Sequence, residues 1–276
     1  MKGIEVQHKE KFDAARHFLS REQSASLLNE SAVRDILESR QNGSLNIVVG
    51  NRAFTISQRL GSGGTKEVYD VHVGNSHFAM ALPGSVDLPK TIVRKWRTVL
   101  NEPDNTRRLR DANLRVNSLS QLIQTKINGH FFPALLMKRY EDLPFTVRDS
   151  KNIGVGASRI FLPGMTVEQI AETIRPMAAD IHVLLQRDIR LGRDSFNLCL
   201  ENGYPHIFFN DLGSAGFEPI LEADIDQIAG HYADATVGAV LNGITEAEYR
   251  EFQADLDDGR DLIVRELKTA ALVGLR

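Results

Sequence analysis

Residues 60–69 combine glycines with a lysine in a pattern suited to phosphate binding. They read Leu-Gly-Ser-Gly-Gly-Thr-Lys-Glu-Val-Tyr. Glycine lets backbone N–H groups approach a phosphate chain closely, and a lysine amine adds positive charge beside that chain. We therefore expect a phosphate-binding turn between two strands, made of Gly61, Ser62, Gly63, Gly64, Thr65 and Lys66.

Acidic and amide side chains that suit acid–base and metal chemistry follow in the second half of the chain. Asp188 stands in Gln-Arg-Asp-Ile-Arg, and Asp194 stands in Gly-Arg-Asp, shortly before Asn197. Asp211 stands in Asn-Asp-Leu-Gly. A carboxylate can take a proton from an attacking hydroxyl, and carboxylate and amide oxygens are ligands that Mg²⁺ accepts. Either kind of chemistry requires the fold to bring these side chains together.

The first half of the chain predicts helices followed by an antiparallel sheet. Residues 5–42 carry apolar side chains at helical spacing, and residues 41–44 end that pattern. Runs of strand character then alternate with Asn-Gly, Gly-Asn and Pro-Gly turns, at 45–49, 53–60, 67–73 and 77–82. A helix is expected over 88–101, a second from Asp104 to about 124, and strands over 126–132 and 134–140.

The second half predicts mainly helices. Thr166 and Gln169 suit a capping box at the start of a helix whose apolar face reaches Leu184. Strands are expected at 196–200 and 206–210, joined by a turn, and two or three helices from Glu222 onward. The fold class is therefore α+β. Its parts are an N-terminal helical extension over 1–44, a sheet-rich lobe over 45–140 and a helical lobe over 141–276.

The composition excludes several classes of protein. The chain has 276 residues with 33 basic and 36 acidic side chains, so no overall field favours nucleic acid. Cys199 is the only cysteine, which excludes an intramolecular disulfide and favours a reducing compartment. No apolar run approaches the roughly 18 residues of a spanning helix, and the N-terminus lacks the apolar core of a secretory signal. We expect a cytoplasmic protein with no membrane span and no nucleic-acid partner.

The order of these motifs resembles that of protein kinases. Residues 78–82, Phe-Ala-Met-Ala-Leu, are similar to the third strand of the kinase small lobe, where the usual pattern is Val-Ala-x-Lys. Ala81 stands at the place of that lysine. The with-no-lysine kinases share this absence and carry their lysine in the glycine-loop strand, where Lys66 is the match. The resemblance covers about residues 50–245 and implies a two-lobed fold with a reduced helical C-lobe.

For the nucleotide, the resemblance implies ATP with its phosphates under the glycine loop and beside Lys66. Glu102 is the expected acidic partner of Lys66, with Asp111 as the alternative. Met137, near the end of the predicted last strand, would line the adenine pocket.

For the chemistry, the resemblance implies that Asn197 and Asp211 hold Mg²⁺. Asp188 would be the base and Arg190 would steady the transferred phosphoryl group, as in the kinase run His-Arg-Asp-Leu-Lys. The interval from Asp188 to Asn197 is longer than in the family, so Asp194 remains an alternative base.

The segment between Asp211 and the helix near Asp226 is too short for a regulated activation segment. The chain therefore resembles the compact kinase-like effectors that bacteria deliver into host cells. The expected function is ATP-dependent transfer of phosphate to a protein hydroxyl, on a host protein if the chain is secreted by a specialised system. Two alternatives stay open: a nucleotide-binding pseudokinase that acts by binding a partner, and a kinase-fold transferase for nucleotidyl groups or small molecules.

Overall fold

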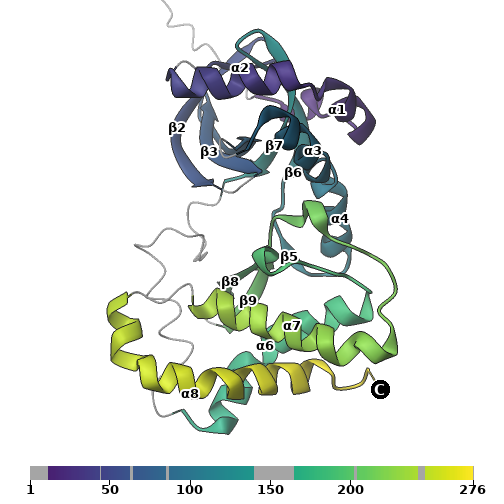
Figure 1. The fold of residues 1–276 in the computed structure, drawn as a ribbon, viewed down its shortest axis with the longest axis vertical. Coiled ribbons are helices and arrows are strands. Elements are labelled where there is room, and N and C mark those ends of the chain that lie inside the picture. The colour runs from purple at the N-terminus through teal and green to yellow at the C-terminus, as the bar shows by residue number, and fades with distance from the viewer. Residues whose placement is uncertain are drawn as a thin grey trace, which may run out of the picture. The chain divides into compact units, whose positions relative to one another are not determined.

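The computed structural model describes residues 12–43, 45–62, 65–84, 87–139, 165–201, 204–241 and 246–275. Helices and strands are both abundant, so the expected α+β class is confirmed (Figure 1). The chain divides into two compact units. Unit 1 contains Met1–Pro103 and Ser118–Arg139, and unit 2 contains Asp104–Asn117 and Tyr140–Arg276. The short segment 104–117 thus groups with unit 2, although it lies inside the sheet-rich lobe that the sequence predicts.

Unit 1 is built around a closed antiparallel barrel (Figure 1). Its strands are β1 (Ile47–Val49), β2 (Arg52–Ser62), β3 (Lys66–Val73), β4 (Ser76–Pro83), β6 (Ser120–Ile127) and β7 (His130–Lys138). They pair in the order β1-β2-β3-β4-β7-β6, and β6 closes the barrel on β1. The predicted antiparallel meander is therefore confirmed for the first four strands.

Among the described residues of unit 1, the helical segments that lie wholly within it are η1 (Ala14–His17), α1 (Arg21–Leu27), α2 (Glu30–Gln41) and α3 (Pro89–Val99). The α1 helix packs against β7, and α2 packs against α3, β4 and β7. Ile36 of α2 and Trp96 of α3 are fully buried in the barrel's core. The indole of Trp96 donates a hydrogen bond to the carbonyl of Pro133 at 3.0 Å. The described part of the N-terminal extension, residues 12–43, is thus an integral part of unit 1.

Two sequence predictions in this region are wrong. The helix from Asp104 toward 124 is in fact α4 (Glu102–Asp111), followed by β5 (Arg115–Val116) and β6. Asn113 has the left-handed φ of 61°, which ends the helix. The strand predicted over 126–132 crosses a turn, because Asn128 and Gly129 have φ values of 47° and 96°. An Asn-Gly pair with positive φ at both residues makes a tight hairpin, so β6 ends at Ile127.

Unit 2 is a helical layer with a small sheet. Helix α4 begins at Glu102 in unit 1 and continues into unit 2. The other helices are α6 (Val167–Gln186), η2 (Arg193–Ser195), η3 (Leu212–Ser214), α7 (Glu222–Leu241) and α8 (Glu246–Ala271). Strands β8 (Phe196–Glu201) and β9 (Tyr204–Phe209) form an antiparallel hairpin, and β5 adds to β9 in parallel.

The predicted elements of unit 2 are confirmed. The Thr166 hydroxyl and the Gln169 side chain form the expected capping box at the start of α6. The hairpin and the two final helices occur as predicted, and α6, α7 and α8 pack on one another (Figure 1). The apolar core includes Ile181, Phe209 and Leu267.

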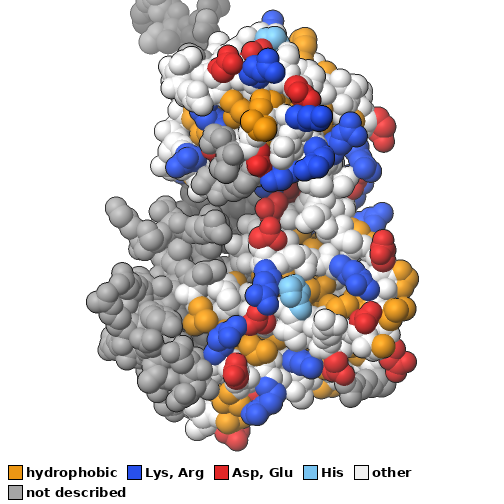
Figure 2. Space-filling model, in the orientation of Figure 1, with side chains coloured by type: hydrophobic (Ala, Val, Ile, Leu, Met, Phe, Trp, Pro, Cys, Tyr) orange, Lys and Arg blue, Asp and Glu red, His pale blue; other side chains and the backbone are white. Residues whose placement is uncertain are grey.

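Over the face shown in Figure 2, basic and acidic side chains are interspersed. Among the helices that the structure describes, none is long and apolar enough to cross a membrane.

Candidate functional site

Lys66 and Glu102 form a buried ion pair in unit 1. The Nζ of Lys66, the first residue of β3, donates to Oε2 of Glu102, the first residue of α4, at 2.7 Å. The side chains are only 12% and 5% exposed. A carboxylate in the first turn of a helix is also stabilised by the helix dipole. The expected partner of Lys66 is thus confirmed as Glu102, whereas Asp111 lies exposed at the other end of α4.

Part of the glycine-rich turn can be described. Gly61 lies at an irregularity in the pairing of β2 with β3, and a Cβ added there would meet no atom within 4 Å. Thr65 is anchored, because its carbonyl accepts a hydrogen bond from the N–H of Gly84 at 2.9 Å. Gly63 and Gly64 lie outside the described residues, and Ser62 is the last residue of β2.

Met137 lies on β7, opposite Ala79 of β4. Its side chain is half-buried and packs against the core of unit 1. This position is compatible with an adenine contact, which stays a prediction.

In unit 2, the β8–β9 hairpin brings Asn197 and Asn210 together. The Nδ2 of Asn197 donates to Oδ1 of Asn210 at 2.8 Å. The last paired residues of β8 and β9 at this end are Phe196 and Phe209. One further backbone hydrogen bond follows this pair. The N–H of Asn210 donates to the carbonyl of Ser195 at 3.1 Å.

Asp211 is held at the same end of the hairpin by main-chain contacts. The buried Ser195 hydroxyl donates to the Asp211 carbonyl at 3.2 Å. Asp211 has a left-handed backbone with φ 53°, a conformation that costs about 1–2 kcal/mol outside glycine and is best tolerated by Asn and Asp. The next carbonyl, of Leu212, accepts a hydrogen bond from Nδ2 of buried Asn105 at 2.7 Å. These contacts hold the backbone of Asp211 directly after Asn210, whose side chain binds Asn197.

The two candidate bases are placed very differently. Asp188 lies in the turn after α6 with a left-handed φ of 55°, and its Oδ1 accepts a hydrogen bond from the N–H of Ile220 at 2.8 Å. Asp194 is exposed and directly precedes Ser195, which contacts Asn210 and Asp211. The Asp194 carboxylate lies over Gly192, where an added Cβ would meet Oδ1 at 2.7 Å. Asp194 is therefore the neighbour in sequence of a residue that contacts the hairpin end, while Asp188 stabilises a turn.

Arg190 is held by the segment that follows η3. Its N–H and carbonyl exchange hydrogen bonds with Gly216 at 2.8 and 2.9 Å, and its Nη2 donates to the Pro219 carbonyl at 3.2 Å. Its side chain also lines a cavity of about 390 Å³ together with Asp224 and His231 of α7.

The hairpin end fits a magnesium ion. Mg²⁺ is usually bound by one or two carboxylates or amides, with phosphate oxygens and water completing its shell. Asp211 and the Oδ1 of Asn197 supply that kind of donor. In the part of the chain that the structure describes, no group of three or more His, Cys, Asp or Glu side chains could hold a metal.

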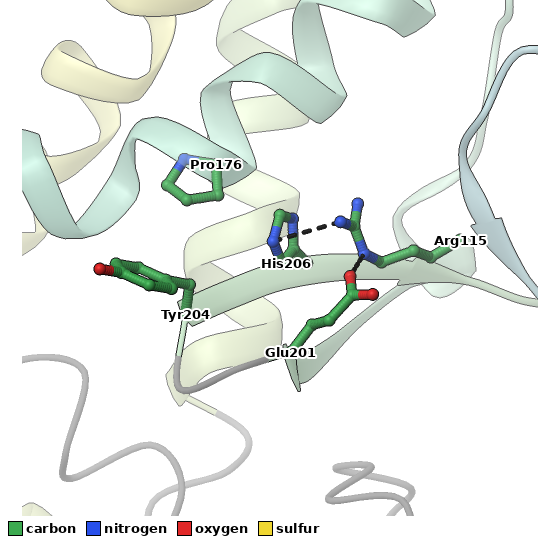
Figure 3. Close-up of a pocket in the computed structure, with 5 residues that line it drawn as sticks. All are labelled: Arg115, Pro176, Glu201, Tyr204 and His206. Atoms are coloured by element: carbon green, nitrogen blue, oxygen red, sulfur yellow. Dashed lines mark hydrogen bonds and ion pairs between the residues drawn. The ribbon is translucent and has the colours of Figure 1, made fainter.

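The other end of the hairpin carries a structural ion network around Arg115 of β5 (Figure 3). Its guanidinium donates to Glu201 at 2.6 Å, to buried Asp180 of α6 at 3.0 Å and to Nε2 of His206 at 3.2 Å. The hydrogen bond from Arg115 lowers the pKa of Glu201. Next to this network, burial raises the pKa of Cys199 to about 12, so the thiol stays protonated. The network ties the sheet to α6 and borders an open cavity of about 550 Å³.

Sequence reasoning misses Asn105, Ser195 and Tyr232, all of which contact the candidate site's loops. Asn105 lies one helical turn after Glu102 in the sequence. This spacing was the one sequence signal that could have pointed to Asn105. Neither a serine in a loop nor a tyrosine in an apolar helix carries such a signal.

No protein-family model matches the chain, and no curated protein matches it. We therefore infer a function from the geometry of these residues.

Proposed function

We propose that this protein is an ATP-dependent phosphotransferase, an atypical protein kinase. The observation that carries the proposal is the buried Lys66–Glu102 pair at 2.7 Å, which places a paired lysine at the start of the strand that follows the glycine-rich turn. A lysine held by a helix glutamate is the arrangement with which kinases bind ATP phosphates. An isolated surface lysine would give no such support.

The second support is the cluster at the end of the β8–β9 hairpin. Asn197 and Asp211 would hold Mg²⁺, which would supply positive charge against the phosphates of the nucleotide. For Lys66 of unit 1, the kinase resemblance implies that its amine binds phosphates of the nucleotide. The cofactors are therefore ATP and Mg²⁺, with adenine near Met137, in the two-lobed arrangement that the kinase resemblance implies.

In the proposed reaction, an acceptor hydroxyl attacks the γ-phosphorus of ATP. The bond between that phosphorus and the β–γ bridging oxygen breaks, and ADP leaves. The acceptor's proton goes to the carboxylate of Asp194, which is exposed and next in sequence to Ser195, a residue that contacts the hairpin end. We favour Asp194 over Asp188 because Oδ1 of Asp188 is engaged by the N–H of Ile220. Arg190 keeps the role of steadying the transferred group, and the acceptor is a protein hydroxyl.

One observation also favours a second candidate, a nucleotide-binding pseudokinase. The aspartate in the kinase-like run, Asp188, accepts a backbone hydrogen bond and stabilises a turn. If Asp194 does not act as a base, the same residues would bind ATP without transferring phosphate, and the protein would act by binding a partner.

Labelled ATP distinguishes these functions. We expect the γ-phosphate, and not the α-phosphate, to appear on protein when the chain is incubated with ATP and Mg²⁺. Transfer of the α-phosphate would indicate nucleotidyl transfer, transfer to a small molecule would indicate a metabolite kinase, and binding without transfer would indicate a pseudokinase. Failure to bind ATP at all would contradict the proposal.

The pair Asp194→Asn and Asp188→Asn identifies the base. Asparagine keeps the size and the acceptor oxygen of each side chain but cannot take a proton at neutral pH. We expect Asp194→Asn to lower the transfer rate by ~100-fold, within the usual range for a general base. Asp188→Asn still accepts the hydrogen bond from Ile220 and should retain most of the activity. The reverse order of effects would assign the base to Asp188.

A further inference from the structure

A single tyrosine hydroxyl holds the loop that carries Asp194. Tyr232 of α7 is 1% exposed, and its hydroxyl donates to the carbonyl of Ile189 at 2.7 Å. The same hydroxyl accepts a hydrogen bond from the N–H of Leu191 at 3.2 Å. Burial raises the pKa of Tyr232, so the hydroxyl keeps its proton and remains a donor. One side-chain atom thus binds two main-chain groups on either side of Arg190.

The ring of Tyr232 also contacts the far end of this loop. Its centroid lies 5.4 Å from that of Phe196, the first residue of β8. Arg193, within the loop, forms an ion pair at 2.7 Å with Asp234 of the same helix. Helix α7 therefore touches the loop before, within and after the short stretch that contains Asp194.

We propose that Tyr232 is a positioning residue, which sets the place of the Asp194 carboxylate relative to Asp211. This inference rests on the proposed phosphotransferase function. A tyrosine that only filled the core would need one partner for its hydroxyl. The two partners of Tyr232 are main-chain groups two residues apart, and both bonds are possible only when the loop takes one conformation. Small displacements of a catalytic group reduce the rate while the binding of the nucleotide is unchanged.

The test is the steady-state rate of γ-phosphate transfer, to protein or to water, by Tyr232→Phe. Phenylalanine keeps the ring contact with Phe196 and removes only the hydroxyl. Thr236→Val is the matched control, because the buried Thr236 hydroxyl donates to the Tyr232 carbonyl one helix turn away, within α7 itself. Like Tyr232→Phe, the Thr236→Val variant loses one buried hydroxyl from α7.

We expect Tyr232→Phe to lower kcat ~10-fold with an unchanged KM for ATP, while Thr236→Val keeps the wild-type kcat. Hydrogen exchange at the Leu191 amide should become faster only in Tyr232→Phe. Equal kcat in the wild type and Tyr232→Phe, or an equal loss in both variants, would overturn the positioning role. A wild-type protein that transfers no phosphate would instead overturn the proposed function, so the two failures are distinguishable.

Discussion

The two groups of candidate residues differ in burial and in the interactions that hold them in place. In unit 1, Lys66 and Glu102 are buried and bind one another directly through their side chains. In unit 2, Asn197 and Asp211 are partly exposed, and main-chain hydrogen bonds around the hairpin end hold their positions. A buried charge depends on its partner for stability, whereas an exposed carboxylate can change with little effect on the fold. Stability and activity should therefore be linked at the Lys66–Glu102 pair and separable at the Asp211 carboxylate.

The largest effect on stability is expected from Lys66→Met. It removes the cation from beside buried Glu102, and breaking such a pair typically costs about 3–5 kcal/mol of unfolding free energy. Urea unfolding measures this loss.

Lys95→Met is the matched control, because Lys95 forms an ion pair with Asp87 at the same distance of 2.7 Å. The Lys95 and Asp87 side chains are 41% and 27% exposed, and removing an exposed pair costs about 1 kcal/mol or less. If the two variants lose the same stability, burial does not distinguish the Lys66 pair.

An intermediate effect is expected from Asn105→Ala in unit 2. The substitution leaves the buried Leu212 carbonyl without its side-chain donor, which costs about 1–3 kcal/mol. It should also weaken ATP binding in the presence of Mg²⁺, since Leu212 follows Asp211. Calorimetric titration with ATP and Mg²⁺ measures the second effect.

Thr125→Val separates the effect on stability from the effect on ATP binding. The Thr125 hydroxyl is buried in unit 1 and donates to the Phe132 carbonyl at 2.7 Å. Its loss should destabilise the protein to a similar degree and leave ATP affinity unchanged. Equal weakening of ATP binding by both variants would show that Asn105 acts only through overall stability.

The smallest effect on stability is expected from Gly192→Ala. Gly192 has an ordinary φ of −76°, so the backbone tolerates alanine and the unfolding free energy should change by about 0.5 kcal/mol or less. The new Cβ would lie 2.7 Å from Oδ1 of Asp194 and must displace that carboxylate. We expect a loss of γ-phosphate transfer in a fully folded protein. In contrast, Gly238→Ala in α7 meets no atom within 4 Å and should leave the rate unchanged.

The sequence predicts features that depend on local chemistry. The capping box at Thr166, the short strands and the β8–β9 hairpin follow from residue type and periodicity. The pairing of Lys66 with Glu102 is expected from the kinase resemblance, which places an acidic partner in the helix after the third strand.

Features that depend on tertiary contacts could not be predicted from the sequence. The residues that flank Asp188 favour it as the base, but the N–H of Ile220, 32 residues later, engages its carboxylate. The role of Tyr232 depends on the packing of α7 against a loop 41 residues earlier. The Asn128-Gly129 turn is different, since its dipeptide is a local signal for a hairpin, and the predicted strand over 126–132 overlooks it.

The central claim is that Asp211 and Asn197 bind a nucleotide through Mg²⁺. Titration of the wild type, Asp211→Asn and Asp188→Asn with ATP, with and without Mg²⁺, tests it most directly. We predict Mg²⁺-dependent binding by the wild type and by Asp188→Asn, and affinity at least ~10-fold weaker for Asp211→Asn, a difference of about 1.4 kcal/mol. Equal affinity of the wild type and Asp211→Asn for ATP, or ATP binding that does not depend on Mg²⁺, would contradict the account.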